Sequence, residues 1–255
     1  MADRSRYTSF AGMRRQQRRL TFERLEDRRL LSLTHLYTFN DGLTNDWIGS
    51  AHATALNGAT VVGGQLVLNN VGVTSGQTTL VQHARLGPNI LGGGDATVQV
   101  WFTTSNAANW ARVFDIGSQS GGVGTSYLAF TPHSSFNDSR AIFLASGGTE
   151  RAASGIFVDD GVEHFASVVI DTAADLLRLY FDGTEVSTSP LGGANAASIN
   201  DSFAFLGRSL FNSDAGFTGS INEVRIYDDA RSAADIAADA ASGPSTDMKS
   251  PLVRQ

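Results

Sequence analysis

The chain contains no cysteine among its 255 residues. This absence excludes disulfide bonds, thiol chemistry and zinc sites built on cysteine ligands. Methionine occurs only three times and charged residues make up only 17% of the chain, whereas glycine occurs 27 times. Such a composition is typical of a β-rich chain with many turns. With 42% hydrophobic residues the chain is long and apolar enough to bury a core.

The N-terminal segment has no apolar run as long as a signal-peptide core or a transmembrane span. Residues 1–31 hold nine arginines and four acidic residues, which gives them a net charge of +5 and leaves −11 for the remainder. A basic segment before an acidic body indicates two roles, and the body would repel nucleic-acid phosphates. The segment is interpreted as a disordered tail or, alternatively, as a short amphipathic helix.

Residues 22–32, FERLEDRRLLS, resemble the LEPR-XLL type of N-terminal segment found on many bacterial exported and surface proteins. Leu25-Glu26 and the run from Arg28 to Ser32 match this pattern, whereas Asp27 replaces its proline. The resemblance implies that the protein is exported to the cell envelope or the extracellular space.

From residue 35 onward, short alternating runs of apolar and polar residues recur between turn-forming residues, a pattern that predicts an antiparallel β-sandwich. The clearest run places Val98, Val100 and Phe102 on one face, with Gln99 and Trp101 on the other. Residues 163–189 predict two strands around a turn at 171–174 and a third strand after Asp182-Gly183. Further strands are predicted at residues 35–39, 64–70, 111–117, 125–132, 140–146, 201–207 and 219–228.

One helix is predicted near the C-terminus. Ser232 precedes an acidic residue, Asp235, by three positions, which is an N-cap pattern ahead of Ile236 and a run of alanines. Gly243-Pro244 ends the helix.

Four ordered blocks of sequence resemble the LamG-like, concanavalin A-like lectin/glucanase family. They are YTFNDG with the hairpin after it, TVQVWFTT, HFASVVIDTAADLLRLYFDGTEV and FLGRSLFNSDAGFTGSINEVRIYDDARSAADI. One departure is Asn222, which stands where the family usually has Asp. The resemblance implies an all-β jelly-roll sandwich with two antiparallel sheets and a short C-terminal helix. In this architecture the last strand pairs beside the first and the helix covers apolar surface. We therefore expect an export segment over 1–32, a jelly-roll domain over 33–241 and a polar tail over 242–255.

No pattern for catalysis stands out. Glucanases of this fold use carboxylates at alternate positions of one strand, and no strand here reads Glu-x-Asp-x-Glu. Glu223 shares its face with Arg225, and a neighbouring cation keeps a carboxylate ionised and ill suited to general-acid work. The five histidines lack metal-binding spacing, and no Gly-x-Ser-x-Gly motif supports a serine nucleophile. We therefore expect a protein that is not an enzyme.

The resemblance also implies a structural calcium ion, because domains of this family often hold one. Oxygen ligands from carboxylates and carbonyls suit an acidic surface rich in loops. The candidate ligands are Asn40, Asp41, Asp46 and Glu223, with Asn222 as an alternative to Glu223. In the competing interpretation, Asp41 and Asp46 only form turns and caps.

Sugar sites in lectins combine an aromatic ring that stacks on the sugar with polar side chains that bind its hydroxyls. The candidates are Gln99, Trp101, Trp110, Arg178 and Tyr180. In the alternative interpretation, Trp101 and Trp110 pack within the domain.

The leading hypothesis is a noncatalytic glycan-binding or adhesion module of the bacterial envelope or extracellular space, whose partner is a glycan or a surface protein. The alternatives are a structural or protein–protein interaction component of the envelope and a glycan-active enzyme.

Overall fold

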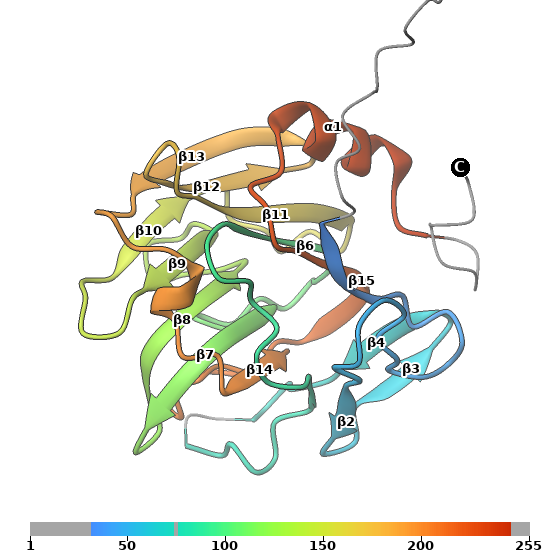
Figure 1. Ribbon diagram of the computed structural model, residues 1–255. Helices are drawn as coiled ribbons and strands as arrows, with labels where there is room; N and C mark the ends of the chain where they lie inside the picture. The colour runs from blue at the N-terminus through green and yellow to red at the C-terminus, as the bar shows by residue number, and fades with distance from the viewer. Residues whose placement is uncertain (1–31, 74–75, 246–255) are drawn as a thin grey trace, which may run out of the picture. The chain divides into compact units, whose positions relative to one another are not determined.

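The structure is a computed structural model that describes residues 32–73 and 76–245. Two antiparallel β-sheets pack against each other, and one α-helix lies over the first of them (Figure 1). This arrangement confirms the predicted all-β sandwich with a C-terminal helix. The predicted export segment, except for Ser32, and the last ten residues of the predicted tail lie outside the described residues. No helix within the described ranges is long and apolar enough to span a lipid bilayer.

The first sheet has eight strands in the order β13-β12-β11-β6-β15-β4-β3, and β1 also pairs with β15. The strands are β1 (Leu33–Tyr37), β3 (Thr60–Val62), β4 (Gln65–Leu68), β6 (Ala96–Thr103), β11 (Glu163–Asp171), β12 (Leu176–Phe181), β13 (Thr184–Pro190) and β15 (Gly219–Tyr227). β4 pairs with the first residues of β15 and β1 with its last four. The last strand therefore lies beside the first, as predicted.

The second sheet has seven strands in the order β10-β9-β8-β7-β14-β5-β2. They are β2 (Thr54–Leu56), β5 (His83–Arg85), β7 (Phe114–Ser120), β8 (Val123–Thr131), β9 (Arg140–Leu144), β10 (Arg151–Ser154) and β14 (Phe203–Leu206). A short 3-10 helix, η1 (Ala196–Ser198), precedes β14. The strand predictions did not include β2, β5 and β10, which are three or four residues long and too short to show alternation.

The main core fills the space between the sheets. Val98, Val100 and Phe102 of β6 are fully buried there, and so are Val224 and Ile226 of β15. Each buried aliphatic or aromatic side chain of this kind stabilises the fold by roughly 1.5–3 kcal/mol. The apolar faces of these two alternating strands therefore form part of the core.

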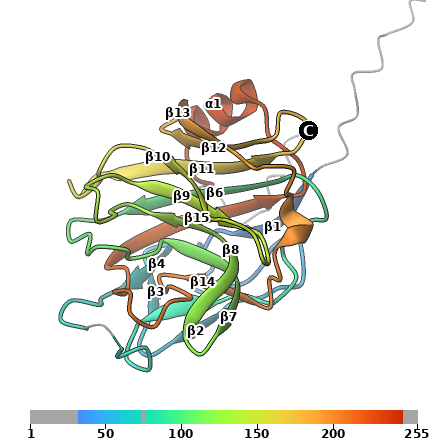
Figure 2. The same ribbon diagram turned by 90° about the vertical axis from the view of Figure 1, so that its left-hand side faces the viewer.

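The helix α1 (Ala233–Ser242) lies beside β12 and β13 in both views (Figures 1 and 2). Ser232 caps it by accepting a hydrogen bond from the backbone N–H of Asp235, and Gly243 ends it with a φ of 67°. Its one fully buried side chain, Ile236, packs on the outer face of the first sheet. Gly183, in the turn between β12 and β13, has a φ of 83°, and a Cβ there would lie 3.0 Å from the Cβ of Ala240.

Candidate functional site

The outer face of the second sheet carries a small apolar cluster of its own. Tyr127 and Ala129 of β8, Ile142 of β9 and Phe205 of β14 are buried there. Leu210, from the loop over residues 207–218, covers this face and is itself buried. The loop over 104–113 contributes a second cover, because Trp110 also packs against the cluster. The two loops thus form the walls above the sheet.

An open cavity of about 190 Å³ lies between these loops, and we call it the Trp110 cavity. Its lining side chains are Trp110, Arg112, Tyr127, Ile142, Glu150, Phe211 and Asp214. Tyr127 and Ile142 come from the sheet, while Trp110 and Phe211 come from the two loops. A cavity of this size is smaller than the usual pocket for a whole drug-sized ligand, so it accepts about one ring.

Trp110 is half-buried and has an unusual backbone conformation. Its φ is 61°, in the left-handed region that bulky side chains rarely adopt. Its backbone N–H donates to the carbonyl of His133 at 2.8 Å. The Nδ1 of the His133 side chain in turn bonds to the carbonyl of Ala107 at 2.7 Å. A residue in such a conformation costs about 1–3 kcal/mol, and such residues cluster at functional sites.

Arg112 supplies the positive charge of the Trp110 cavity. Its guanidinium lies 5.2 Å from the centre of the Trp110 ring. It also forms ion pairs with Asp115 at 3.7 Å and with Asp214 at 3.5 Å. The side chain is buried, yet its Nε and Nη1 have no hydrogen-bond partner. Both nitrogen atoms are shielded from solvent and the Nε faces Asp115, so Arg112 acts on the cavity through its charge and through its position over the Trp110 ring.

A buried carboxylate, Asp115, and a half-buried one, Asp214, fix the wall of the cavity. Asp115 accepts a hydrogen bond from the backbone N–H of Leu210 at 2.9 Å, and the hydroxyl of Ser209 donates to Asp214 at 2.7 Å. Burial raises the pKa of Asp115 to about 7, against the opposing effects of the Arg112 charge and the Leu210 N–H. Burial likewise raises the pKa of Asp214. The network ties the loop over 207–218 to β7.

Tyr127 and Glu150 complete the polar lining. The hydroxyl of Tyr127 donates to the carboxylate of Glu150. Burial and this contact raise the pKa of Tyr127, so its phenol remains a neutral hydrogen-bond donor. The ring of Phe211 packs edge-on against Tyr127, with 5.5 Å between the ring centres.

Of the five predicted sugar-binding residues, Trp110 lies at this cavity, and the other four lie on the first sheet. Trp101 is 3% exposed. Its ring lies 4.5 Å from that of Phe165, and the guanidinium of Arg225 lies over it at 4.5 Å. Gln99 donates to Asp239 of α1 at 2.9 Å. Trp101 therefore presents no free ring face for stacking in this structure.

The remaining two predicted residues have partners within the domain. Arg178 forms ion pairs with Asp171 at 3.0 Å and with Glu185 at 2.9 Å. Tyr180 is 3% exposed and packs in the cluster under α1. The sequence did not single out Arg112, Tyr127, Glu150, Phe211 and Asp214 as site residues. Strand pairing β7–β14 and β7–β8 brings them together from distant parts of the chain, and no spacing in the sequence signals it.

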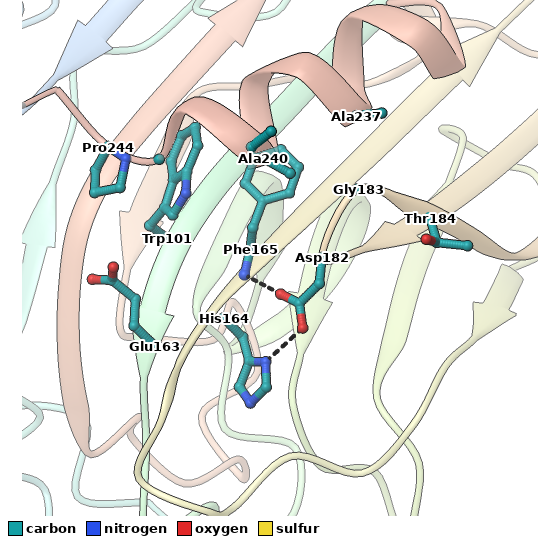
Figure 3. A pocket seen from close by; sticks show the side chains of 12 residues that line it. Trp101, Glu163, His164, Phe165, Asp182, Gly183, Thr184, Ala237, Ala240 and Pro244 are labelled. Atoms are coloured by element: carbon teal, nitrogen blue, oxygen red, sulfur yellow. Dashed lines mark hydrogen bonds and ion pairs between the residues drawn. The ribbon is translucent and has the colours of Figure 1, made fainter.

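A second cavity of about 420 Å³ lies at the end of α1 (Figure 3). Trp101 and Phe165 point toward the helix, whereas His164 and Asp182 point away from it. The Nδ1 of His164 bonds to Asp182 at 2.9 Å and its Nε2 to Asp160 at 3.1 Å. Burial lowers the pKa of His164, but the two carboxylates outweigh this effect and raise it.

The polar groups of this second cavity are largely paired with one another. Asp182 also accepts from the backbone N–H of Phe165 at 2.9 Å, and Glu163 accepts from Asn222 at 2.7 Å. The cavity is larger than the Trp110 cavity, but its aromatic side chains Trp101 and Phe165 are each only 3% exposed, whereas Trp110 is half-buried. We therefore take the Trp110 cavity as the candidate site.

The four predicted calcium ligands do not share one hydrogen-bond network: Asn40 and Glu223 are linked through Ser245, whereas Asp41 and Asp46 each have other partners. Asp46 accepts from His35 and from the backbone N–H groups of Leu36, Gly49 and Ala51. Burial alone would raise the pKa of Asp46, but these hydrogen bonds lower it to about 2. Its carboxylate oxygens are thus already occupied.

The other three predicted ligands are likewise engaged. Asp41 accepts from the N–H of Leu43 and from Asn45. Glu223 accepts from Arg225 and from the N–H of Ser245, whose carbonyl accepts from Asn40. Within residues 32–73 and 76–245, no three His, Asp or Glu side chains lie close enough together to hold a metal ion. These residues do not form one set of calcium ligands, and calcium binding stays a prediction.

Structural comparison finds three informative relatives of the fold. Domain 4 of the extracellular arabinanase AbnA from Geobacillus stearothermophilus, in complex with arabinotriose, is 15% identical with a TM-score of 0.57, and the match covers 82% of this chain and 98% of that domain. The CBM40 of the Ruminococcus gnavus IT-sialidase, bound to α2,6-sialyllactose, is 13% identical with a TM-score of 0.50 and coverage of 58% and 83%. The receptor-binding domain of botulinum neurotoxin mosaic serotype C/D is 11% identical with a TM-score of 0.57, and the match spans 83% of this chain but only 51% of that one.

At these identities the structural likeness shows the fold alone. The search of curated proteins gave no match. Residues 75–237 match the model of the concanavalin A-like lectin/glucanases superfamily. Because this match covers more than half of the chain, the protein belongs to the concanavalin A-like lectin/glucanases superfamily.

Proposed function

We propose that the protein is an exported, noncatalytic glycan-binding module of the bacterial envelope or extracellular space, and that it binds sugar in the Trp110 cavity. The observation that carries this proposal is a half-buried tryptophan ring in a cavity that is also lined by the polar side chains of Tyr127, Glu150 and Asp214. An aromatic ring stacks on the apolar face of a sugar, and fixed donors bind the hydroxyls at its edge.

One sugar ring would lie between Trp110 and Phe211 in this proposal. The carboxylates of Asp214 and Glu150, which line the cavity, accept from hydroxyl groups of the sugar. The contacts of Asp115 with the loop hold Phe211 in place before the ligand arrives. A pre-formed site loses little conformational entropy on binding.

Two of the structural relatives support a sugar ligand. The arabinanase domain holds arabinotriose and the sialidase CBM40 holds sialyllactose. The proposal of a noncatalytic role is supported by the placement of Asp115. This carboxyl, whose pKa is raised to about 7, is fully buried and cannot reach a glycosidic oxygen as a general acid would.

The export part of the proposal is supported by the Arg-rich segment over 1–32 and its resemblance to LEPR-XLL segments. Fractionation of cells that produce the full chain tests it. Recovery in the envelope or the medium agrees with export, and recovery only in the cytoplasm of the native host contradicts it.

The proposal is tested by a glycan-array screen of the full chain, run with Ca²⁺ and again with a chelator. We expect binding to a defined glycan class by the wild type and loss of this binding in Trp110→Ala. Phe136→Ala is the matched control, because it removes an exposed aromatic ring from a neighbouring loop. Silence of a folded wild type under both conditions would contradict sugar binding. Binding that occurs with Ca²⁺ and is lost with the chelator would indicate that the glycan site needs a calcium ion.

An exposed apolar patch favours a second candidate function, adhesion to a protein surface. Phe136 and Ile156 are 67% and 59% exposed. The backbone N–H of Ser139 donates to the carbonyl of Ile156 at 3.1 Å, which joins two of the loops concerned. Apolar groups gathered at a loop end are typical of protein contact sites. Phe136→Ser with Ile156→Ser would then abolish adhesion to cells while leaving glycan binding unchanged.

A further inference from the structure

A third cavity, of about 270 Å³, lies on the outer face of the second sheet at β5 and β14. It is lined by Leu56, Asn57, Thr78, Thr79, His83, Arg85, Gln119, Phe203, Phe205 and Arg208. The loop over 207–218 contributes to both cavities on this face. Arg208 at its start lines the third cavity, whereas Phe211 and Asp214 line the Trp110 cavity.

The lining of this third cavity is positively charged. It includes Arg85 and Arg208 but no aspartate or glutamate, while burial and the two arginines lower the pKa of His83 and favour its neutral ring. This charge stands out because the chain after residue 31 has a net charge of −11. Burial and the nearby Arg85 lower the pKa of Arg208. The two guanidinium groups therefore repel each other, and no carboxylate lines the cavity to offset the repulsion.

Both arginines, the exposed Arg85 and the half-buried Arg208, stack on the aromatic floor of the cavity. The guanidinium of Arg85 lies 5.2 Å from the centre of the Phe203 ring, and that of Arg208 lies 4.9 Å from the Phe205 ring. The ring of His83 packs edge-on against Phe205 at 5.4 Å. Stacking holds a guanidinium by its face and leaves the N–H groups at its edge free for hydrogen bonds.

One nitrogen of the Arg208 guanidinium has no hydrogen-bond partner. The Nε of Arg208 is buried without a hydrogen bond, and so is the Oε1 of Gln119. Placing like charges together in a half-buried site and leaving a donor unpaired costs stability. Such costs are typical of a binding site, because the ligand supplies the missing negative charge.

We propose that the cavity between Arg85 and Arg208 binds the oxyanion of an acidic sugar, a carboxylate or a sulfate. This inference rests on the proposed function, because it assigns the ligand class of the same sheet face. The planar fork of a guanidinium matches an oxyanion with two parallel hydrogen bonds. Asn57, Thr78 and Thr79 supply polar groups at the rim for the hydroxyls of the same sugar.

Calorimetric titration of the full chain with three probes tests this inference. The probes are trigalacturonic acid, its neutral methyl ester and a sulfated galacto-oligosaccharide. We expect at least one acidic probe to bind about tenfold or more tightly than the ester, and its affinity to fall with added salt. A preference for the carboxylate or for the sulfate identifies the source of the oxyanion.

The variants Arg85→Gln and Arg208→Gln should each weaken binding of the acidic probe by about tenfold or more. Arg151→Gln is the matched control, since it removes one positive charge from β10, outside the cavity. Near-ultraviolet circular dichroism confirms that each variant is folded. Equal affinity for the acid and the ester, or wild-type affinity in Arg208→Gln, would overturn the inference.

This outcome is distinguishable from failure of the proposed function. If a neutral glycan binds and Trp110→Ala abolishes that binding, the proposed function stands and only the oxyanion site is overturned. If no glycan binds to the folded wild type, the proposed function itself fails.

Discussion

The substitution Asp46→Asn tests the contacts that organise the first loop of the sandwich. The carboxylate of Asp46 is fully buried and receives hydrogen bonds from His35 and from the backbone N–H groups of Leu36, Gly49 and Ala51. These contacts lower its pKa from 3.8 to about 2. An amide keeps the shape of the side chain but places an N–H₂ group against donors, so at least one contact is lost.

The magnitude follows from the pKa difference. One pKa unit corresponds to about 1.36 kcal/mol, so a shift from 3.8 to about 2 stabilises the folded state by about 2.4 kcal/mol. The folded-state pKa lies below the unfolded value. This stabilisation is therefore fully present above about pH 4 and is lost as the pH falls toward 2.

Urea unfolding of the wild type and of Asp46→Asn, measured between pH 7 and pH 2.5, checks this prediction. We expect the variant to be less stable by about 2–3 kcal/mol at pH 7, and the difference to shrink as the pH falls below 4. A difference that is absent at pH 7, or that stays constant across this range, would refute the reasoning. If Ca²⁺ stabilises the wild type but not the variant, Asp46 binds the predicted cation and the hydrogen-bond network does not account for its role.

Three further predictions concern the two tryptophans and the histidine. Trp101→Ala should destabilise the protein by about 3–5 kcal/mol, because it leaves a cavity under α1. Urea unfolding measures this loss, and an unchanged unfolding midpoint would contradict the packing role of Trp101. Trp110→Gly should lose less stability than Trp101→Ala, because glycine adopts the positive φ without strain and this offsets part of the lost packing against the outer cluster, while glycan binding is lost; a stability loss as large as that of Trp101→Ala would contradict this reasoning. His164→Gln should abolish a stabilisation that is full below the ordinary histidine pKa of 6.5 and disappears as the pH rises through the raised folded-state value; melting curves from pH 5 to 9 measure it, and identical pH profiles would contradict the pairing with Asp160 and Asp182.

Alternation along the strands was sufficient to predict the fold. Val98, Val100 and Phe102 face the core as expected, and the N-cap at Ser232 begins the predicted helix. Alternation is a local property, so it survives in any sandwich that buries one face of each strand. The short strands β2, β5 and β10 could not be predicted, because three or four residues acquire their pairing only from the neighbouring strands.

Less of the candidate site than of the fold could be predicted from the sequence. Alternation correctly placed Trp101 opposite the core, but it does not say whether another element covers that face, and α1 covers it. Trp110 was identified as a candidate because it stands in a loop. Its neighbours Phe211 and Asp214 lie about a hundred positions along the chain. The pairings of β7 with β14 and of β6 with β15 bring these two loops together, and such long-range pairing leaves no local signal.

The central claim is that sugar binds at Trp110 rather than at the other tryptophans. The chain has three tryptophans, and each gives one indole N–H signal in a proton–nitrogen correlation spectrum, which Trp→Phe variants assign. The decisive measurement is a titration of the labelled full chain with the strongest glycan from the array. We predict that the Trp110 signal shifts with the glycan concentration while the signals of Trp101 and Trp47 stay in place. A shift of the Trp101 or Trp47 signal with Trp110 unmoved would contradict the claim.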